Sequence, residues 1–182
     1  MLFHHAQGLT AGVLAFADDL RAAGHVVHTP NLYDGRTFPT VEEGVAHAQE
    51  LGFGNVVECD VRAADGLPAE LVYAGLSLDV MPAQQLAQTR AGARGAVLCE
   101  ACVPSSEFGD GWPAGVPVQV HGMDADVFFA GEGDIEAARA LVAEAGTSAH
   151  AELFVYPGDR YLFADNSLAP PNCTSSSPSH PL

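Results

Sequence analysis

The sequence predicts a three-layer α/β/α sandwich around a mostly parallel sheet. Short apolar runs alternate along the chain with stretches in which apolar residues recur at helical spacing. The 182 residues, of which 48% are hydrophobic, suffice for one well-buried domain. The centre of the pattern is the stretch 71–86, where an apolar run turns sharply and continues as a helix.

The predicted elements follow one another in a regular order. The first half carries strands at 2–4 and 25–29 and helices at 13–20, 40–51 and 55–64. Thr40 and Glu43 form a capping box, and Asp34-Gly35 predicts a turn. The second half carries strands at 71–74, 95–101, 116–121 and 151–156, a helix at 80–87, and a last helix capped by Asp134.

The two ends of the chain depart from this pattern. The first strand is cut short, and no helical pattern follows the last strand. The Pro/Ser-rich stretch 169–182 has no apolar period. We therefore expect one domain over 1–168, incomplete at both ends, and a disordered tail over 169–182. A missing closing helix would leave an apolar sheet face uncovered, so we expect marginal stability or association through that face. The expected state is a monomer or a weak homo-oligomer.

Composition excludes several kinds of partner. The formal net charge of -16 argues against nucleic acid and against anionic membrane surfaces, because both are bound through basic residues. The sequence shows no secretory signal, no membrane span and no phosphate-binding glycine loop. Four scattered cysteines are expected to be reduced thiols, and together with the missing signal they predict a cytoplasmic protein. Because no phosphate-binding glycine loop is present, we expect no nucleotide cofactor.

The turn Gly75-Leu76-Ser77 has the context of a nucleophile elbow, which is a strand, a tight turn and a helix. Such a turn exposes the serine oxygen, and the helix start supplies amide groups that stabilise an oxyanion. Gly-x-Ser alone usually marks only a turn. Asp79 stands where the elbow pattern has its second glycine, and it brings negative charge near the site.

Five segments occur in the order typical of one enzyme family. They are His4–Gly8, Asn31–Arg36, Gly75–Ala83, His121–Asp126 and Tyr156–Asp165. Over residues 2–168 the chain thereby resembles the dienelactone hydrolase-like proteins of the α/β-hydrolase superfamily. This resemblance implies an α/β-hydrolase fold and attack by a serine or cysteine on the carbonyl of a small ester or lactone. The sequence motifs themselves indicate no metal or other cofactor.

The resemblance also assigns roles to individual residues. It makes Ser77 the nucleophile and the backbone amides of Ala6 and Leu78 the oxyanion hole. It makes Asp126 the acid that orients the base, with Asp124 as the alternative. Arg36 resembles a position that anchors a substrate carboxylate, although a solvated loop arginine explains it equally well.

One departure concerns the catalytic base. The family has a histidine in a Gly-Asp-x-His-Leu-Phe context, where this chain has Tyr161. A phenol with a pKa near ~10 is a poor base at neutral pH. His5 is the best candidate for a replacement base or a substrate contact, although a histidine that bonds the backbone is the commoner case. Two hypotheses remain, which are a weakened ester or lactone hydrolase and a non-catalytic, ligand-binding relic.

Other candidate sites are weaker. The strand ends carry three histidines and two aspartates that could offer mixed metal ligands; these are His4, His5, His121, Asp124 and Asp126. Their spacing matches no recognisable metal-binding pattern. Cys99 and Cys102 form a C-x-x-C pattern at a strand end. A redox pair needs a helix N-terminus, so we interpret both cysteines as small apolar residues.

Overall fold

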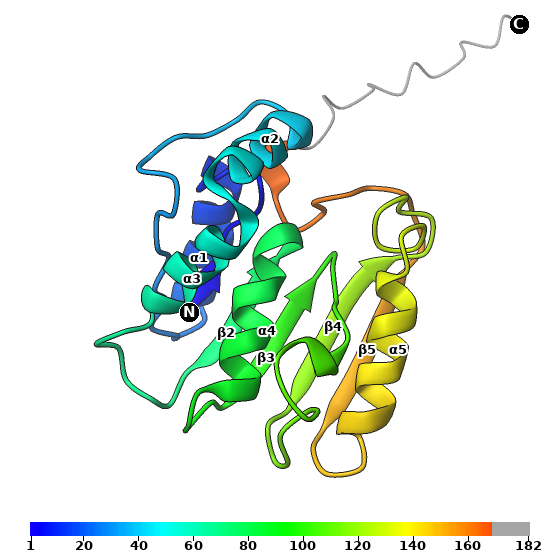
Figure 1. Cartoon of the computed structure of the whole chain (residues 1–182). Coiled ribbons are helices and arrows are strands. Elements are labelled where there is room, and N and C mark those ends of the chain that lie inside the picture. The colour runs from blue at the N-terminus through cyan, green and yellow to red at the C-terminus, as the bar shows by residue number, and fades with distance from the viewer. Residues whose placement is uncertain (169–182) are drawn as a thin grey trace, which may run out of the picture.

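Five parallel strands form one sheet in the spatial order β1-β2-β3-β4-β5 in the computed structural model, which describes residues 1–168 (Figure 1). The strands are β1 (Leu2–Phe3), β2 (Val72–Leu76), β3 (Gly95–Cys99), β4 (Val118–Met123) and β5 (Ala151–Tyr156). The α-helices are α1 (Ala11–Ala22), α2 (Val41–Leu51), α3 (Phe53–Arg62), α4 (Val80–Thr89) and α5 (Asp134–Ala145). The predicted tail, 169–182, lies outside the described residues.

Helices α4 and α5 cover one side of the sheet (Figure 1). Their inward residues were predicted from helical spacing and are buried; they are Val80, Ala83, Leu86, Ala87, Ile135, Ala138 and Leu141. They pack on Phe3, Leu98 and Val120 from the sheet. Full burial of a side chain of this size contributes about 1.5–3 kcal/mol, so this layer is the main source of stability.

The opposite side of the sheet is covered unevenly. Helix α1 places Val13 and Ala17 against β1, β2 and β3. On β4 and β5 the same side carries His121 and Phe154, whose rings stack with centroids 4.8 Å apart, and both side chains stay half-buried. Within residues 1–168, no α-helix follows β5, and the strand pairs only with β4. The expectation of a partly uncovered face therefore holds for the described residues.

The predicted strand at 25–29 is wrong. This segment runs beside β1 but shares only the hydrogen bond from the Leu2 amide to the His28 carbonyl, at 2.8 Å. A strand needs a ladder of such bonds, and β1 is only two residues long. The start of the last helix also differs, because Gly133 is its N-cap and Asp134 is its first residue.

Helix α2 holds the first loop in place. Thr40 caps α2 by accepting a hydrogen bond from the Glu43 amide at 3.2 Å, as the sequence predicted. A Cβ added to Gly44 would lie 2.1 Å from the Ala6 carbonyl oxygen, so only glycine lets α2 pack this closely. The helix therefore fixes the loop that was predicted to carry part of the oxyanion hole.

The three cysteines within residues 1–168 lie in different surroundings. Cys99 and Cys102 are free thiols buried in separate apolar clusters, and Cys59 is free and exposed. Burial raises the pKa of the Cys102 thiol to about 12, so it behaves as a small apolar group. No helix in the described part of the chain is long and apolar enough to cross a membrane.

Candidate active site

The predicted strand, turn and helix are present around Ser77. Strand β2 ends at Leu76, a 3₁₀ turn covers Ser77–Asp79, and α4 begins at Val80. Ser77 has a φ of 52°, a left-handed conformation that costs a non-glycine residue on the order of 1–3 kcal/mol. Gly75 makes the tight turn possible, because a Cβ there would lie 2.4 Å from the Asp79 carbonyl oxygen. Strain of this kind is typical of a functional site.

Asp79 lies beside His4 in the interior of the fold. Asp79 is buried, and its Oδ2 lies 2.9 Å from His4 Nδ1. His4 Nε2 accepts a hydrogen bond from the Leu32 amide at 3.4 Å, so we assign the ring proton to Nδ1. That N–H also lies 2.8 Å from the His5 carbonyl oxygen. The imidazole of His4 therefore lies beside the aspartate that replaces the second glycine of the elbow pattern, but Asp79 Oδ2 has no hydrogen-bond partner within residues 1–168.

Ser77 and Tyr161 are direct hydrogen-bond partners. Tyr161 lies in the loop after β5, and its ring packs against Phe128 with the centroids 4.4 Å apart. Burial raises the pKa of the Tyr161 hydroxyl, and the charges of nearby carboxyl groups raise it further, against a smaller opposing effect of the Ser77 hydrogen bond. The phenol is therefore protonated at neutral pH and cannot accept the serine proton.

The structure distinguishes the two candidate acids after β4. Asp126 is buried, its Oδ1 accepts a hydrogen bond from the Phe128 amide at 2.9 Å, and its Oδ2 has no partner within residues 1–168. Burial raises the pKa of Asp126, although backbone amides oppose the shift. Asp124 is exposed, and it accepts a hydrogen bond from the Gly158 amide at 3.0 Å. Asp124 therefore ties two loops together, and Asp126 is the better candidate for a catalytic acid.

The amides of Ala6 and Leu78 are available. Ala6 is buried in the turn after β1, and its amide donates no hydrogen bond within the described residues. Leu78 is the second residue of the 3₁₀ turn at Ser77–Asp79, where backbone amides lack partners of their own. Because β1 and β2 are parallel neighbours, the loops that carry these amides lie at the same edge of the sheet.

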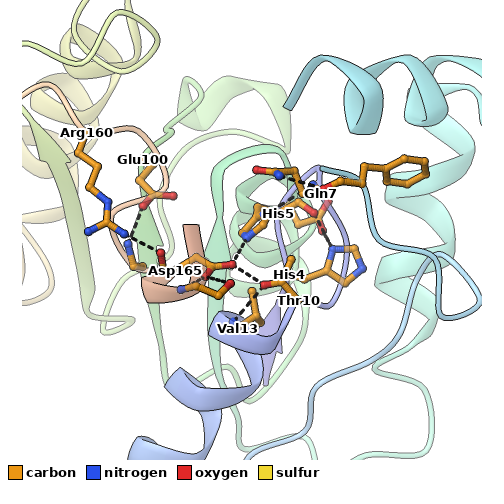
Figure 2. A network of polar contacts seen from close by, with 12 residues as sticks. His4, His5, Gln7, Thr10, Val13, Glu100, Arg160 and Asp165 are labelled. Atoms are coloured by element: carbon orange, nitrogen blue, oxygen red, sulfur yellow. Dashed lines mark hydrogen bonds and ion pairs between the residues drawn. The ribbon is translucent and has the colours of Figure 1, made fainter. Parts of the chain in front are cut away.

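His5 is engaged elsewhere. Its Nε2 lies 2.9 Å from Asp165 Oδ2, and its Nδ1 accepts a hydrogen bond from the Gln7 amide at 3.2 Å. Figure 2 shows His5 and Asp165 pointing toward one another, with Thr10 beside them. Both ring nitrogens are used and the side chain is fully buried, so His5 is neither a replacement base nor a substrate contact in this arrangement.

Asp165 is a structural residue that sequence reasoning missed. Burial alone would raise its pKa, but hydrogen bonds from His5, Ser167 and Thr10 outweigh this effect and lower the pKa. The contact between His5 and Asp165 spans 160 positions and ties the first loop to the last. The only sequence signal for it was that both residues lie in segments of the family-like pattern.

Arg36 lies beside the loop that carries Ala6. The segment around it is held by two hydrogen bonds between Gln7 and Phe38, both 2.9 Å long. The exposed guanidinium group lies 5.3 Å from the Phe38 ring centroid and 3.4 Å from His47 Nδ1. Within the described residues, Arg36 forms no ion pair with a carboxylate. Its group is therefore available to an anionic ligand.

Glu100 is a second residue that the sequence did not single out. It follows β3, and the pairing of Leu76 with Cys99 puts it at the strand end next to Ser77. It is buried with a φ of 70°, and its Oε1 accepts a hydrogen bond from the Ala164 amide at 3.0 Å. Burial raises the pKa of Glu100 to about 7. In the sequence, Glu100 could have been recognised as a candidate because it is a charged residue directly after a buried strand.

The other candidate ligands do not gather. The His121 Nδ1 hydrogen-bonds the Tyr156 hydroxyl at 2.9 Å, on the side of the sheet that carries Phe154. Among residues 1–168, no group of three or more histidine, cysteine, aspartate and glutamate side chains is arranged to hold a metal ion.

Comparison with known proteins gives a match in structure but not in sequence. No protein-family model matches the chain, and no curated protein matches it. The dienelactone hydrolase-like promiscuous phosphotriesterase P91 from metagenomic libraries superposes with a TM-score of 0.68 at 14% identity, over 89% of this chain and 70% of P91.

Two further structures give similar results. A candidate hydrolase of the alpha/beta superfamily from Xanthomonas campestris pv. campestris has a TM-score of 0.59 at 19% identity, over 92% of this chain and 93% of its own. The Bacillus cereus carboxylesterase has a TM-score of 0.51 at 16% identity, over 92% of this chain and 85% of the esterase chain. At these identities the likeness concerns the fold, and this chain has the α/β-hydrolase fold.

Proposed function

We propose that this chain, given its α/β-hydrolase fold, is a hydrolase that cleaves small carboxylic esters or lactones through Ser77, at a rate limited by the lack of a catalytic base. The observation that carries the proposal is the strained Ser77, which stands at the start of a helix with its hydroxyl against Tyr161. The solved structures with this fold include a carboxylesterase and a dienelactone hydrolase-like enzyme.

In the proposed reaction, Ser77 Oγ attacks the substrate carbonyl carbon. The amides of Leu78 and Ala6 donate hydrogen bonds to the oxyanion that forms. Each such donor typically raises kcat by roughly 10²–10³-fold. The serine proton leaves to a solvent base, because Tyr161 is itself protonated. The Tyr161 hydroxyl donates a hydrogen bond to the departing alcohol oxygen, which takes its proton from solvent. A water molecule then attacks the acyl carbon, the bond to Ser77 Oγ breaks, and the acid and the free serine are released.

The test compares the hydrolysis of p-nitrophenyl acetate by the wild type, Ser77→Ala and Ser106→Ala. Ser106 is an exposed serine in the short 3₁₀ helix Ser105–Glu107 and controls for the loss of a hydroxyl group. We expect Ser77→Ala to lose the enzymatic turnover and Ser106→Ala to keep it, with an acetyl adduct on Ser77 visible by mass spectrometry. Turnover that is equal in Ser77→Ala and the wild type would exclude a serine hydrolase.

We propose further that Arg36 binds a carboxylate on the substrate. Its exposed guanidinium lies beside the Ala6 loop without a carboxylate partner in the described residues. Arg36→Gln should then raise KM for an ester that carries a carboxylate and leave KM for p-nitrophenyl acetate unchanged. Arg139→Gln, on the exposed face of α5, removes the same charge elsewhere and serves as the control. Equal effects on both esters would refute this role.

The alternative is a non-catalytic binding protein of the same fold. It is favoured by the contact of the protonated Tyr161 with Ser77, which leaves the serine without a base. The loss of turnover in Ser77→Ala would exclude this alternative.

We propose that the protein works in the cytoplasm on a small-molecule substrate, as a monomer or weak homo-oligomer. The three free thiols among the described residues and the net charge of -16 support this setting, without nucleic acid or membrane as partner.

A further inference from the structure

A second group of buried polar atoms lies between α3 and the loop that precedes α2. Asp60, on α3, is fully buried, and neither of its carboxylate oxygens has a hydrogen-bond partner within residues 1–168. The buried Tyr33 hydroxyl lacks a partner in the same part of the chain. Leaving buried polar groups unpaired costs several kcal/mol, so a donor from outside the described residues would stabilise this arrangement.

A pocket opens beside Asp60. Its volume is about 120 Å³, and it is lined by Leu32, Leu51, Asn55, Val56, Cys59 and Asp60. Leu51, Asn55 and Cys59 are exposed, whereas Val56 and Asp60 are buried, so the pocket leads from the surface to the carboxyl group. The space equals that of about four water molecules at roughly 30 Å³ each.

The charges around the pocket favour a cation. The buried Asp79 is close enough to Asp60 for its negative charge to act on it. Arg62, on the same helix, is exposed and pairs with Glu58 instead of Asp60. No basic side chain within residues 1–168 pairs with Asp60. A chelated metal ion would need several ligands, and residues 1–168 contain no such group.

We propose that this pocket binds a small primary alkylammonium ion, with the ammonium group on Asp60 and the alkyl chain between Leu32 and Val56. An ammonium group offers three donors, which is enough for both free oxygens of the Asp60 carboxylate that lines the pocket. The largely apolar wall and the small volume suit a chain of about three carbons.

Binding should be coupled to pH. Burial, and then the charge of Asp79, raises the pKa of Asp60 to about 8, so the empty pocket holds a protonated acid at pH 7. The ammonium ion needs the carboxylate, so its affinity should rise with pH until Asp60 is ionised. The titratable groups that face Asp60 or its neighbours are Asp79 from the elbow, Tyr33 from its loop, His4 beside Asp79, His47 beside Tyr33, and Cys59 on α3.

The experiment is thermal unfolding of the full chain at pH 8, in n-propylammonium chloride and in sodium chloride at equal concentration. A ligand at ~100 times its Kd shifts the unfolding equilibrium about 100-fold, which raises Tm by about 5–10 °C for a domain of this size. We expect this shift with propylammonium in the wild type and in Glu58→Gln, an exposed control on the same helix, but not in Asp60→Asn.

Val56→Phe provides a second test that leaves the charges unchanged, because a larger side chain fills the pocket and should abolish the shift. Equal Tm values in the two salts, as expected if the pocket holds only water, would overturn the proposal. So would an undiminished shift in Asp60→Asn. The readout is folding stability, so the result does not depend on whether Ser77 is catalytic.

Discussion

Replacing Tyr161 with histidine should restore the missing base. The Tyr161 ring already brings a hydroxyl to Ser77 Oγ, and the buried Asp126 Oδ2, on the neighbouring loop, has no partner among the described residues. An imidazole at this position would accept the serine proton on one nitrogen. Its other nitrogen would donate to Asp126, which would hold the ring and stabilise its charged form.

The magnitude follows from general base catalysis, which contributes about 10²–10⁴-fold. At about 1.36 kcal/mol per tenfold change, this equals a barrier lowered by roughly 2.7–5.5 kcal/mol. The assay is kcat/KM for p-nitrophenyl acetate at pH 8, where an imidazole with a pKa near ~6.5 is neutral. The wild-type phenol stays protonated at this pH because burial raises its pKa.

Two controls accompany this variant. Tyr161→Phe keeps the ring against Phe128 and removes only the hydroxyl, so it should give no gain. Adding Asp126→Asn to Tyr161→His should remove most of the gain, because the imidazole loses its carboxylate partner. If Tyr161→His is no faster than Tyr161→Phe, the missing base is not what limits this protein, and the reasoning fails.

Three further predictions concern stability. Gly75→Ala should lower the free energy of unfolding in urea by about 3 kcal/mol or more, because its Cβ would lie 2.4 Å from the Asp79 carbonyl oxygen. The control Gly54→Ala, in open space on α3, should raise it by about 0.5–1 kcal/mol, and equal effects of the two variants would refute the close packing. Asp165→Asn should lower the free energy of unfolding by about 2–4 kcal/mol. Because the folded pKa of Asp165 lies below its unfolded value, the wild type should lose stability as pH falls below about 4, and the variant should lack this contribution. Glu100 has a folded pKa of about 7, above its unfolded value, so it should make wild-type Tm fall as pH rises from about 5 to 7, and Asp60, with a folded pKa of about 8, acts in the same direction. Glu100→Gln should therefore remove part of this slope, and a variant whose slope is as steep as that of the wild type would contradict the assignment.

The elements that sequence predicted well are those with a local signal. The elbow could be predicted because a β-rich run, Gly75 and a helical apolar stripe follow one another within 16 residues. The inward faces of α4 and α5 followed from spacing alone. The segment 25–29 has the composition of a strand, but strand formation depends on a partner with enough free backbone groups, and composition does not report that partner.

The candidate site was predictable only where a motif carried the information. Ser77 and Tyr161 are 84 positions apart, and only the family-like segment after β5 indicated that Tyr161 would lie at the serine. The partner of His5 was missed because a contact across 160 positions leaves no periodicity in the sequence. Asp60 looks like an ordinary polar residue of an amphipathic helix, and its complete burial results from how α3 packs.

Among the described residues, the outer edge of β5 has no strand partner, and this edge bears on how the protein should be handled in the laboratory. Its outer backbone groups, together with the exposed Val155 and Tyr156, form a template on which another molecule can add a strand. Mutual repulsion among highly acidic copies opposes such stacking, and it vanishes near the isoelectric point of about 4.5. Acidic elution or crystallisation buffers should therefore precipitate the sample as β-rich aggregates, and mildly alkaline, low-salt storage should keep it dispersed.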